Sequence, residues 1–320
     1  MTRERAYPDR GVRLRLFGLL AILIGIGTAL LGLSHLALPL LADAIPDFRF
    51  SRSQILTGVT TFVGIGVVLI ACGVGSMRQR RWAPTAMLTV GWTWLLVGIA
   101  TIGFVVTNLD DLTLLAGSEL ADPSPEVEAL IGWMLIVPGV GVCIALPLLF
   151  LWAYRDKGML ATCRARSPQP DWSDRCPPTV LVLSLAVGFT GFLMVPMALR
   201  PLLPWFGRLL TGTAGSLATL VIGGLFVWIG WALFRLKRSG WWATAISTIA
   251  VAVSSAWTVL ETPRGEWYRA LEFPEKQIEL LLAAGEPSRW PGIAASLVLT
   301  LVTAIYLASI RKYFWSDARH

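Results

Sequence analysis

The feature that most constrains this chain is a series of eight long apolar blocks, none of which contains Asp, Glu, Lys or Arg. The blocks are 16–38, 55–76, 84–107, 130–153, 179–199, 216–234, 242–260 and 291–310. About 20 apolar residues are enough for a helix to cross the hydrocarbon core of a bilayer. Lipid offers no hydrogen-bond partner to the backbone, so blocks of this length are expected to be helical. We therefore predict an all-α integral membrane protein with about eight transmembrane helices.

The composition agrees with that prediction. Of the 320 residues, 55% are hydrophobic and only 15% are charged, whereas about a quarter of the residues in a soluble domain are charged. The net charge of +7 resembles that of a protein that binds nucleic acid. Because the basic residues occupy short segments between the apolar blocks, we interpret them as orientation signals instead. We expect no nucleic-acid partner.

Charged residues are divided unequally between the two sides of the predicted membrane. The N-terminus, the even-numbered connections and the C-terminus hold 19 of the 27 basic residues, whereas the opposite side holds 14 of the 20 acidic residues. Basic connections favour the cytoplasm, which predicts that both termini are cytoplasmic. The preference for Arg over Lys is typical of a GC-rich bacterial genome, so we expect a multi-pass protein of the bacterial cytoplasmic (inner) membrane.

A cleaved signal peptide is the alternative interpretation of the first block. Ala42-Asp43-Ala44 resembles a cleavage site, and a basic segment precedes the block. The apolar run is longer than the 7–15 residues typical of a signal peptide, which favours a retained helix. Cleavage would leave seven helices.

The two halves of the sequence resemble each other when they are offset by 160 residues. Arg78 then aligns with Arg238 and Trp82 with Trp242, and each half has a basic turn between two helices and a long acidic loop. An even number of helices per copy makes such a repeat parallel. We predict two four-helix repeats; the alternative is that any eight-helix protein divides into halves of similar hydropathy.

The predicted organisation has five parts. These are a cytoplasmic N-terminal segment 1–15, a first four-helix unit 16–154, a cytoplasmic linker 155–178, a second four-helix unit 179–312 and a cytoplasmic C-terminal tail 313–320. The polar, Pro-containing run 166–174 favours a flexible linker.

The basic hairpins have a pattern of their own. The residues that carry it are Gly73, Gly75, Arg78, Arg80, Arg81, Trp82 and Ala83, and again Gly230, Arg235, Lys237, Arg238, Trp242 and Ala243. The pattern resembles small bacterial four-helix membrane proteins in which a Gly-rich helix ends in a basic turn followed by Trp-Ala. This resemblance covers one hairpin per half and implies a similar build, but no activity.

Glycine, proline and acidic residues predict three local features. Glycines recur every seven residues at 18, 25 and 32, at 66 and 73, and at 132 and 139, which favours close helix packing within the chain, or alternatively a homodimer face. Pro138 predicts a kink in the fourth helix; a substrate site at an interrupted helix is the alternative. The segment 274–285 begins with Pro and acidic residues and ends with Gly, as a short surface helix does.

Two groups of residues are candidates for a functional site. His35 and Glu261 lie at the outer ends of the first and seventh blocks and either form a paired site or lie unpaired among lipid headgroups. Trp92, Trp94 and Trp257 lie inside the third and seventh blocks beside hydroxyl residues. They either line a cavity between the halves or form hydrogen bonds between helices.

The sequence contains no catalytic, nucleotide or metal motif. Cys163 and Cys176 share one polar connection, but their spacing fits no zinc pattern and neither His35 nor His320 is near them in the sequence. We therefore expect no enzyme, no cofactor and no metal. The leading hypothesis is an accessory or structural membrane component that binds lipid, another membrane protein or a second copy of itself. The alternative is a facilitator or transporter for a neutral or apolar molecule.

Overall fold

Eight helices of the computed structural model, which describes residues 8–39, 51–107, 109, 125–283 and 290–315, are long and apolar enough to cross a membrane. They confirm the eight predicted blocks to within a few residues at each end. The helices are α1 (Gly11–Ser34, continued by the 3-10 turn η1, His35–Ala37), α3 (Arg52–Met77), α4 (Trp82–Thr107), the composite α6–η2–α7 (Pro125–Val140, Gly141–Ala145 and Leu146–Tyr154), α9 (Pro178–Met197), α10 (Gly212–Phe234), α11 (Arg238–Glu261) and α14 (Trp290–Ile310). The chain is an all-α polytopic membrane protein.

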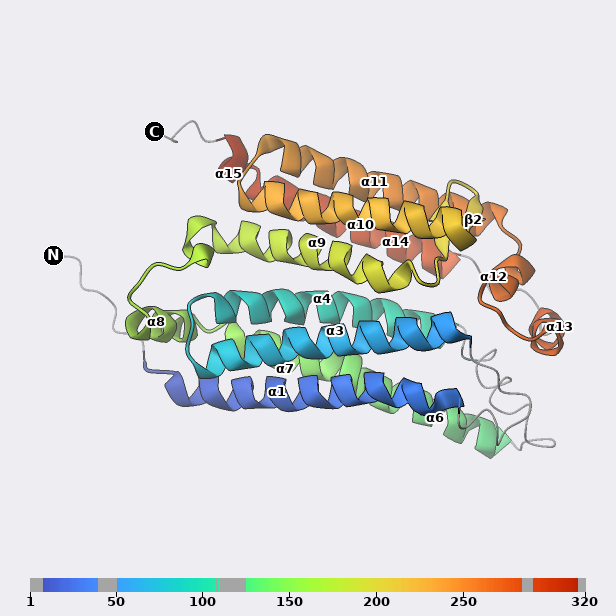
Figure 1. The fold of residues 1–320 in the computed structure, drawn as a ribbon, viewed down its shortest axis with the longest axis horizontal. Helices are drawn as coiled ribbons and strands as arrows, with labels where there is room; N and C mark the ends of the chain where they lie inside the picture. The colour runs from blue at the N-terminus through green and yellow to red at the C-terminus, as the bar shows by residue number, and fades with distance from the viewer. Residues whose placement is uncertain (1–7, 40–50, 108, 110–124, 284–289, 316–320) are drawn as a thin grey trace.

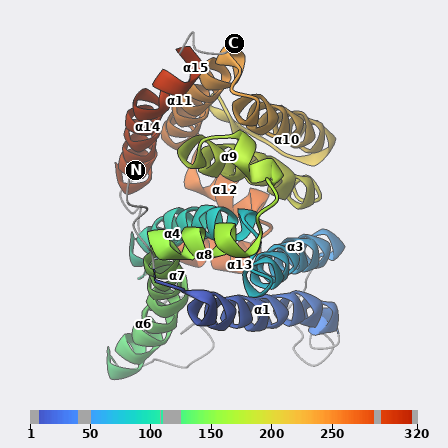
Figure 2. The same ribbon diagram turned by 90° about the vertical axis from the view of Figure 1, so that its left-hand side faces the viewer.

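The eight helices form two groups of four (Figures 1 and 2). The first unit contains α1, α3, α4 and α6–α7, and its core includes Leu14, Met87 and Phe150. The second unit contains α9, α10, α11 and α14, and its core includes Ile229 and Leu233. The units meet chiefly where α9 packs against α4 and α3. The start of α1, the helix α15 (Lys312–Trp315) and the turn between α3 and α4 lie at one end of the bundle (Figure 1), which we call the basic end.

Glycines hold α1 and α3 unusually close together. A Cβ atom added to Gly66 would lie 2.6 Å from the carbonyl oxygen of Gly25, and one added to Gly73 would lie 2.6 Å from that of Gly18. Real Cβ atoms do not approach other atoms this closely, so only glycine allows these two backbones to touch. The predicted use of these glycines in packing within the chain is confirmed.

The helix pair α9 and α10 of the second unit makes a similar contact. A Cβ on Gly223 would lie 2.9 Å from the oxygen of Gly191, and one on Gly230 would lie 2.8 Å from that of Ser184. The Ser184 hydroxyl also donates to the Gly230 oxygen at 2.7 Å. Gly223 and Gly230 are seven residues apart, as Gly66 and Gly73 are. The first two helices of each unit are therefore in close backbone contact at two positions that lie two helical turns apart.

The turns that follow these two hairpins have the same backbone geometry. Gln79 and Leu236 both take positive φ, at 53° and 54°, and the next residue, Arg80 or Lys237, donates its N–H to a carbonyl five residues earlier at 2.9 Å. Gln79 therefore corresponds to Leu236, an offset of 157 residues. The predicted offset of 160 is three residues too large in this turn, where Arg81, not Arg78, corresponds to Arg238. The Trp-Ala pairs misled the sequence alignment because three additional helical residues, Ser239, Gly240 and Trp241, precede the Trp242-Ala243 pair after the second turn.

The end opposite the basic end carries a small β-hairpin that the sequence analysis did not predict. Strands β1 (Leu203–Trp205) and β2 (Arg208–Leu210) pair antiparallel, and Gly207 at their turn has a φ of 86°. Hydroxyls of α11 hold this turn: Ser254 accepts from the Phe206 N–H at 3.0 Å and donates to the Pro204 oxygen at 2.9 Å. We call this the hairpin end.

Two short helices, α12 (Arg264–Ala270) and α13 (Glu275–Ala283), also lie at the hairpin end (Figure 1). α13 confirms the short helix predicted for 274–285, and it buries Ile278 and Leu281. Arg200 connects the end of α9 to this region by donating to the Leu271 oxygen and forming an ion pair with Glu272 at 3.4 Å. The long acidic loop predicted in the first half, at 108–129, lies largely outside the described residues, and the alternative signal-peptide site at 42–44 lies wholly outside them.

The fourth span continues through Pro138, which lies inside α6, and a wide π turn, η2, follows the proline. The kink predicted at Pro138 stays a prediction. α4 packs directly on this turn. A Cβ on Gly98 would lie only 2.1 Å from the Cys143 carbonyl oxygen, so the glycine makes room for the π turn. Extra width in one turn of a helix is a common accommodation near proline.

The connection between the units differs from the predicted flexible linker. It contains α8 (Lys157–Arg166) and the 3-10 helix η3 (Trp172–Arg175). α8 buries Met159 and Cys163 in the core of the first unit, and its Thr162 hydroxyl accepts from the Arg10 N–H at 3.0 Å. This helix precedes the polar run 166–174, and its buried residues Gly158, Met159, Thr162 and Cys163 share one face. The chain closes with α15 (Lys312–Trp315).

Candidate functional site

The structure places His35 and Glu261 in different units. His35 packs on α3, with its ring centroid 5.4 Å from that of Phe62 and its Cδ2 atom beside Gly58. Its Nδ1 atom lies 2.8 Å from the Leu31 oxygen of its own helix. Glu261 ends α11 and lies near Gly207 of the β-hairpin. No contact between His35 and Glu261 occurs among the described residues, and a paired site there stays a prediction.

The three candidate tryptophans are also divided between the units. Trp94 packs inside the first unit, 6.4 Å between ring centroids from Phe150. Trp257 packs on Phe206 of the β-hairpin at 6.5 Å, with the rings nearly perpendicular. Trp92 and Trp257 are each about half exposed. These ring contacts of Trp94 and Trp257 are local to each unit, and a shared cavity stays a prediction.

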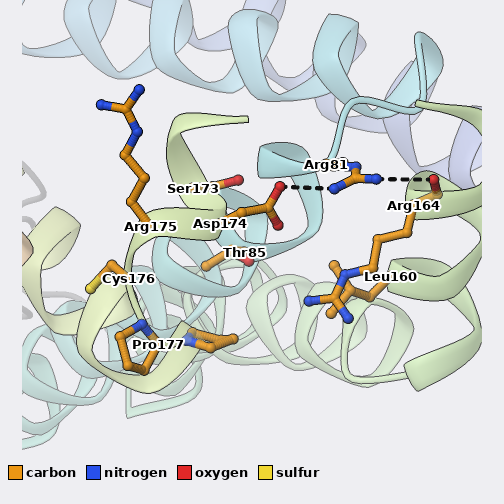
Figure 3. A pocket seen from close by; sticks show the side chains of 10 residues that line it. Arg81, Thr85, Leu160, Arg164, Ser173, Asp174, Arg175, Cys176 and Pro177 are labelled. Carbon is orange, nitrogen blue, oxygen red and sulfur yellow. Dashed lines mark hydrogen bonds and ion pairs between the residues drawn. The ribbon is translucent and has the colours of Figure 1, made fainter. Parts of the chain in front are cut away.

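A different site lies at the basic end, where the two units and their connection meet. Here a hollow of about 300 Å³ opens between the start of α4, α8, η3 and the start of α9 (Figure 3). Its lining is Arg81, Thr85, Leu160, Arg164, Ser173, Asp174, Arg175, Cys176, Pro177 and Pro178. We call it the arginine pocket. Its position at the first residues of two spans places it where apolar helices give way to polar connections.

Arg81 fixes the shape of the arginine pocket. Its guanidinium donates to the carbonyl oxygens of Ser167, Arg164 and Pro168 and to the Asp174 Oδ2 atom at 2.9 Å. These contacts fasten α8 and η3 to the start of α4 (Figure 3). A planar guanidinium with five N–H groups suits this role because it satisfies several acceptors from one position.

Asp174 is the one acidic side chain in the lining of the pocket. The Asp171 N–H donates to its Oδ2 atom at 2.9 Å. This backbone hydrogen bond, together with the neighbouring Arg81, holds the pKa of Asp174 below its ordinary value. The carboxylate therefore stays charged at neutral pH, and its Oδ1 atom accepts no hydrogen bond from the described residues.

Arg164 and Arg175 supply the remaining charge of the pocket. Both are exposed, and neither forms an ion pair with a described residue. Since Arg81 and Asp174 neutralise each other, the pocket keeps a net charge of two positive units from these side chains. Such a site attracts anions, and guanidinium groups bind phosphate oxygens through paired hydrogen bonds.

The thiols near the pocket are not suited to nucleophilic chemistry. Cys163 and Cys176 are free and buried, and burial raises the pKa of each to about 11. A thiol is reactive as a thiolate, which these residues do not form near neutral pH. Among the described residues, no three His, Cys, Asp or Glu side chains come together as a metal site.

The similar turn of the second unit is packed by an aromatic side chain. Arg238, which matches Arg81 in the turn geometry, donates to the Phe314 oxygen at 3.3 Å, and its guanidinium lies 5.8 Å from the centre of the Trp315 ring. Arg311 also lies over this ring, at 5.2 Å. An indole thus packs on Arg238, whereas Arg81 contacts carbonyl oxygens and Asp174 beside a hollow.

Sequence reasoning missed the arginine pocket. It counted the arginines at 81, 164 and 175 among the orientation signals, and their gathering depends on the fold of α8 and η3. The one signal that pointed this way was the density of arginine in the connection 155–178. Comparison with protein-family models, curated proteins and solved structures finds no match to this chain.

Proposed function

We propose that this protein is a non-catalytic accessory component of the bacterial cytoplasmic membrane that binds an anionic lipid in the arginine pocket. The observation that carries the proposal is the open hollow beside Arg164 and Arg175 at the ends of two spans. Basic pockets between transmembrane helices on the cytoplasmic side are suited to acidic lipid headgroups. The acyl chains would run along the apolar helix surfaces below the pocket.

Orientation is part of this proposal. Of the described residues at the basic end, Arg78, Arg155 and Lys157 add to the arginines of the pocket, and basic connections favour the cytoplasm. Both termini are then cytoplasmic, and the pocket faces the inner leaflet.

We also propose that the two units are copies of one four-helix ancestor. The matched glycine contacts and the matched left-handed turns, at an offset of 157 residues in α3–α4 and α10–α11, support it. In this interpretation the pocket of the first unit stayed open, whereas Trp315 filled its counterpart.

Native mass spectrometry of the protein released from its own membranes tests the lipid proposal. We expect phospholipid adducts on the natural chain and a loss of most of them in the double variant Arg164→Gln/Arg175→Gln. The matched control is Arg78→Gln/Arg80→Gln, which removes the same charge from exposed residues of the basic end outside the pocket lining. Equal lipid retention by the two variants, or a protein partner in place of lipid, would overturn the proposal.

A facilitator for a neutral molecule is the second candidate, and the π turn in the fourth span favours it. This turn, η2, packs on α4, which carries Trp92 and Trp94, and π turns inside α-helices are frequent at functional sites. Stopped-flow swelling of proteoliposomes with glycerol and urea as probes tests it. Swelling no faster than that of empty liposomes would remove support from this candidate.

A further inference from the structure

The β-hairpin fills a step that the unequal ends of two helices leave at the hairpin end. The Ser216 hydroxyl, four residues inside the start of α10, donates to the Ala198 oxygen directly after the end of α9 at 2.8 Å. α9 therefore ends about one turn short of the start of α10. The chain turns back within this step as β1 and β2, beside the ends of α10 and α11 (Figure 1). β2 returns directly against α10, where a Cβ on Gly215 would lie 2.6 Å from the Leu210 oxygen.

Hydroxyl groups of α11 satisfy the backbone of the hairpin turn. The Phe206 N–H donates to the Ser254 hydroxyl at 3.0 Å, and the Gly207 N–H donates to the Thr258 hydroxyl at 3.1 Å. Ser254 and Thr258 are buried and lie about 10 Å and about 5 Å along the axis from the end of α11 at Glu261. Because lipid offers the backbone no hydrogen-bond partner, polar backbone groups within a bilayer need partners from the protein. Both N–H groups of this turn have such partners.

Apolar side chains that face outward indicate that lipid reaches the level of the turn. Val253 and Leu260 of α11 and Leu217 of α10 are exposed. Leu260 lies two residues closer to the end of α11 than Thr258 does, so the apolar outer surface of this helix extends past the hairpin turn. An exposed apolar surface on a membrane span is a surface for lipid. The turn therefore lies beside a helix face that is in contact with lipid.

Three aromatic side chains continue this apolar surface across the hairpin. Trp205, Phe206 and Trp257 are between 44% and 51% exposed. Their rings pack edge to face, with centroids 5.6 Å apart for Trp205 and Phe206 and 6.5 Å apart for Phe206 and Trp257. Arg208, which pairs with Trp205 in the register of the strands, is also exposed. Aromatic rings beside a long cationic side chain are typical of the boundary between hydrocarbon and headgroups.

We propose that the β-hairpin is a membrane anchor, which inserts the side chains of Trp205 and Phe206 into the lipid leaflet at the hairpin end. The rings lie with Trp257 at the boundary between headgroups and hydrocarbon, and the Arg208 guanidinium reaches the phosphates. The occupant of this surface is lipid, because the aromatic patch is continuous with the lipid-facing sides of α10 and α11. The proposal is independent of the arginine pocket, which lies at the opposite end of the molecule.

Electron paramagnetic resonance of a spin label at position 206 tests the proposal in nanodiscs of phosphatidylethanolamine and phosphatidylglycerol. The label is attached to the variant Phe206→Cys. Its collision rates are measured with oxygen, which concentrates in lipid, and with a nickel chelate, which stays in water. Val253→Cys, on the exposed side of α11, is the lipid reference, and Lys276→Cys, at an exposed position of α13, is the water reference. The natural chain, treated in the same way, gives the background from its own cysteines.

We expect the ratio of oxygen to nickel collisions at position 206 to be several-fold higher than at position 276 and close to that at position 253. Trp205→Cys provides a second probe position if thermal unfolding in detergent shows that Phe206→Cys is not folded, and the same result is expected there. A ratio at the hairpin equal to that at position 276 would overturn the proposal, since the hairpin would then lie in water. A label that meets neither oxygen nor nickel would also overturn it, because protein would then cover the hairpin.

Discussion

At the scale of single residues, glycine decides how closely the helices of each unit approach. Gly25 and Gly66 place backbone against backbone, and contacts of this kind add dispersion energy in a medium where the hydrophobic effect does not drive helix association. The adjacent Gly64 faces open space, with no heavy atom within 4 Å of an added Cβ. In α3, helix packing therefore requires glycine at position 66 but not at position 64.

Gly66→Ala is expected to lower the free energy of unfolding by about 1–3 kcal/mol, the usual cost of overpacking. The added methyl group would meet the Gly25 oxygen and force α1 and α3 apart. Gly64→Ala is the control and should leave stability unchanged or slightly raised. Reversible unfolding in mixed micelles measures both. Equal stability of the two variants would mean that the α1–α3 contact is looser than the structure has it.

Cys163 and Cys176 give a pH-dependent prediction. Because burial raises the pKa of each thiol to about 11, maleimide labelling of the folded protein at pH 7 should be slow. Its rate should rise about tenfold per pH unit as the thiolate fraction increases. Labelling after unfolding in SDS is the control. Because the pKa of each thiol is higher in the folded protein than in the unfolded chain, the protonated thiols stabilise the folded state fully below about pH 9. This contribution to the free energy of unfolding is lost as the pH rises from about 9 to 11. Fast labelling of the folded chain at pH 7 would show that these thiols are accessible.

At the scale of elements, the spans and the connections differ in how far the sequence predicts them. The eight spans depend on local composition, because lipid forces any long apolar run to satisfy its own backbone. The β-hairpin depends on Ser254, about 50 residues away from the amide it accepts from. The arginine pocket depends on Arg81 reaching carbonyls more than 80 residues later. Such contacts leave no period or motif in the sequence, so the helices were predictable and the pocket was not.

Ser254→Ala should loosen the β-hairpin. The substitution leaves the partly buried Phe206 N–H and Pro204 oxygen without their hydroxyl partner, and a hydrogen bond of this kind contributes about 0.5–1.5 kcal/mol. Faster amide hydrogen exchange is expected in residues 203–210, with the helices of the second unit unaffected. Ser255→Ala, on the next residue of α11, is the control. Unchanged exchange in the Ser254 variant would show that the strands hold the hairpin without α11.

At the scale of the whole molecule, Arg81 connects the two units. It is the side chain that fastens α8 and η3 to α4, and the second unit begins directly after η3. The units also touch along α4 and α9 within the helical layer. The connection and the helix interface are therefore two separate attachments between the same bodies.

Arg81→Gln is expected to free the connection while both units stay folded. The amide cannot replace the three carbonyl contacts and the ion pair with Asp174, so residues 167–171 should become more accessible. Limited trypsin digestion should then cut after Arg166 several times faster than in the natural chain. Arg80→Gln, an exposed neighbour in the same turn, should be cut at the natural rate. If Arg81→Gln is no more sensitive, other contacts hold the connection.

The helix α8, the start of α1 and the helix α15 lie at one end of the bundle (Figure 1), and this arrangement affects how the gene itself can be arranged. Each unit begins and ends on the same side of the membrane, because it has an even number of spans. The four spans of one unit can therefore be inserted before those of the other unit are synthesised. The coding order of the two units is therefore free: a circularly permuted gene that opens between Ser167 and Asp171, or two separate genes, would require no new segment to cross the membrane.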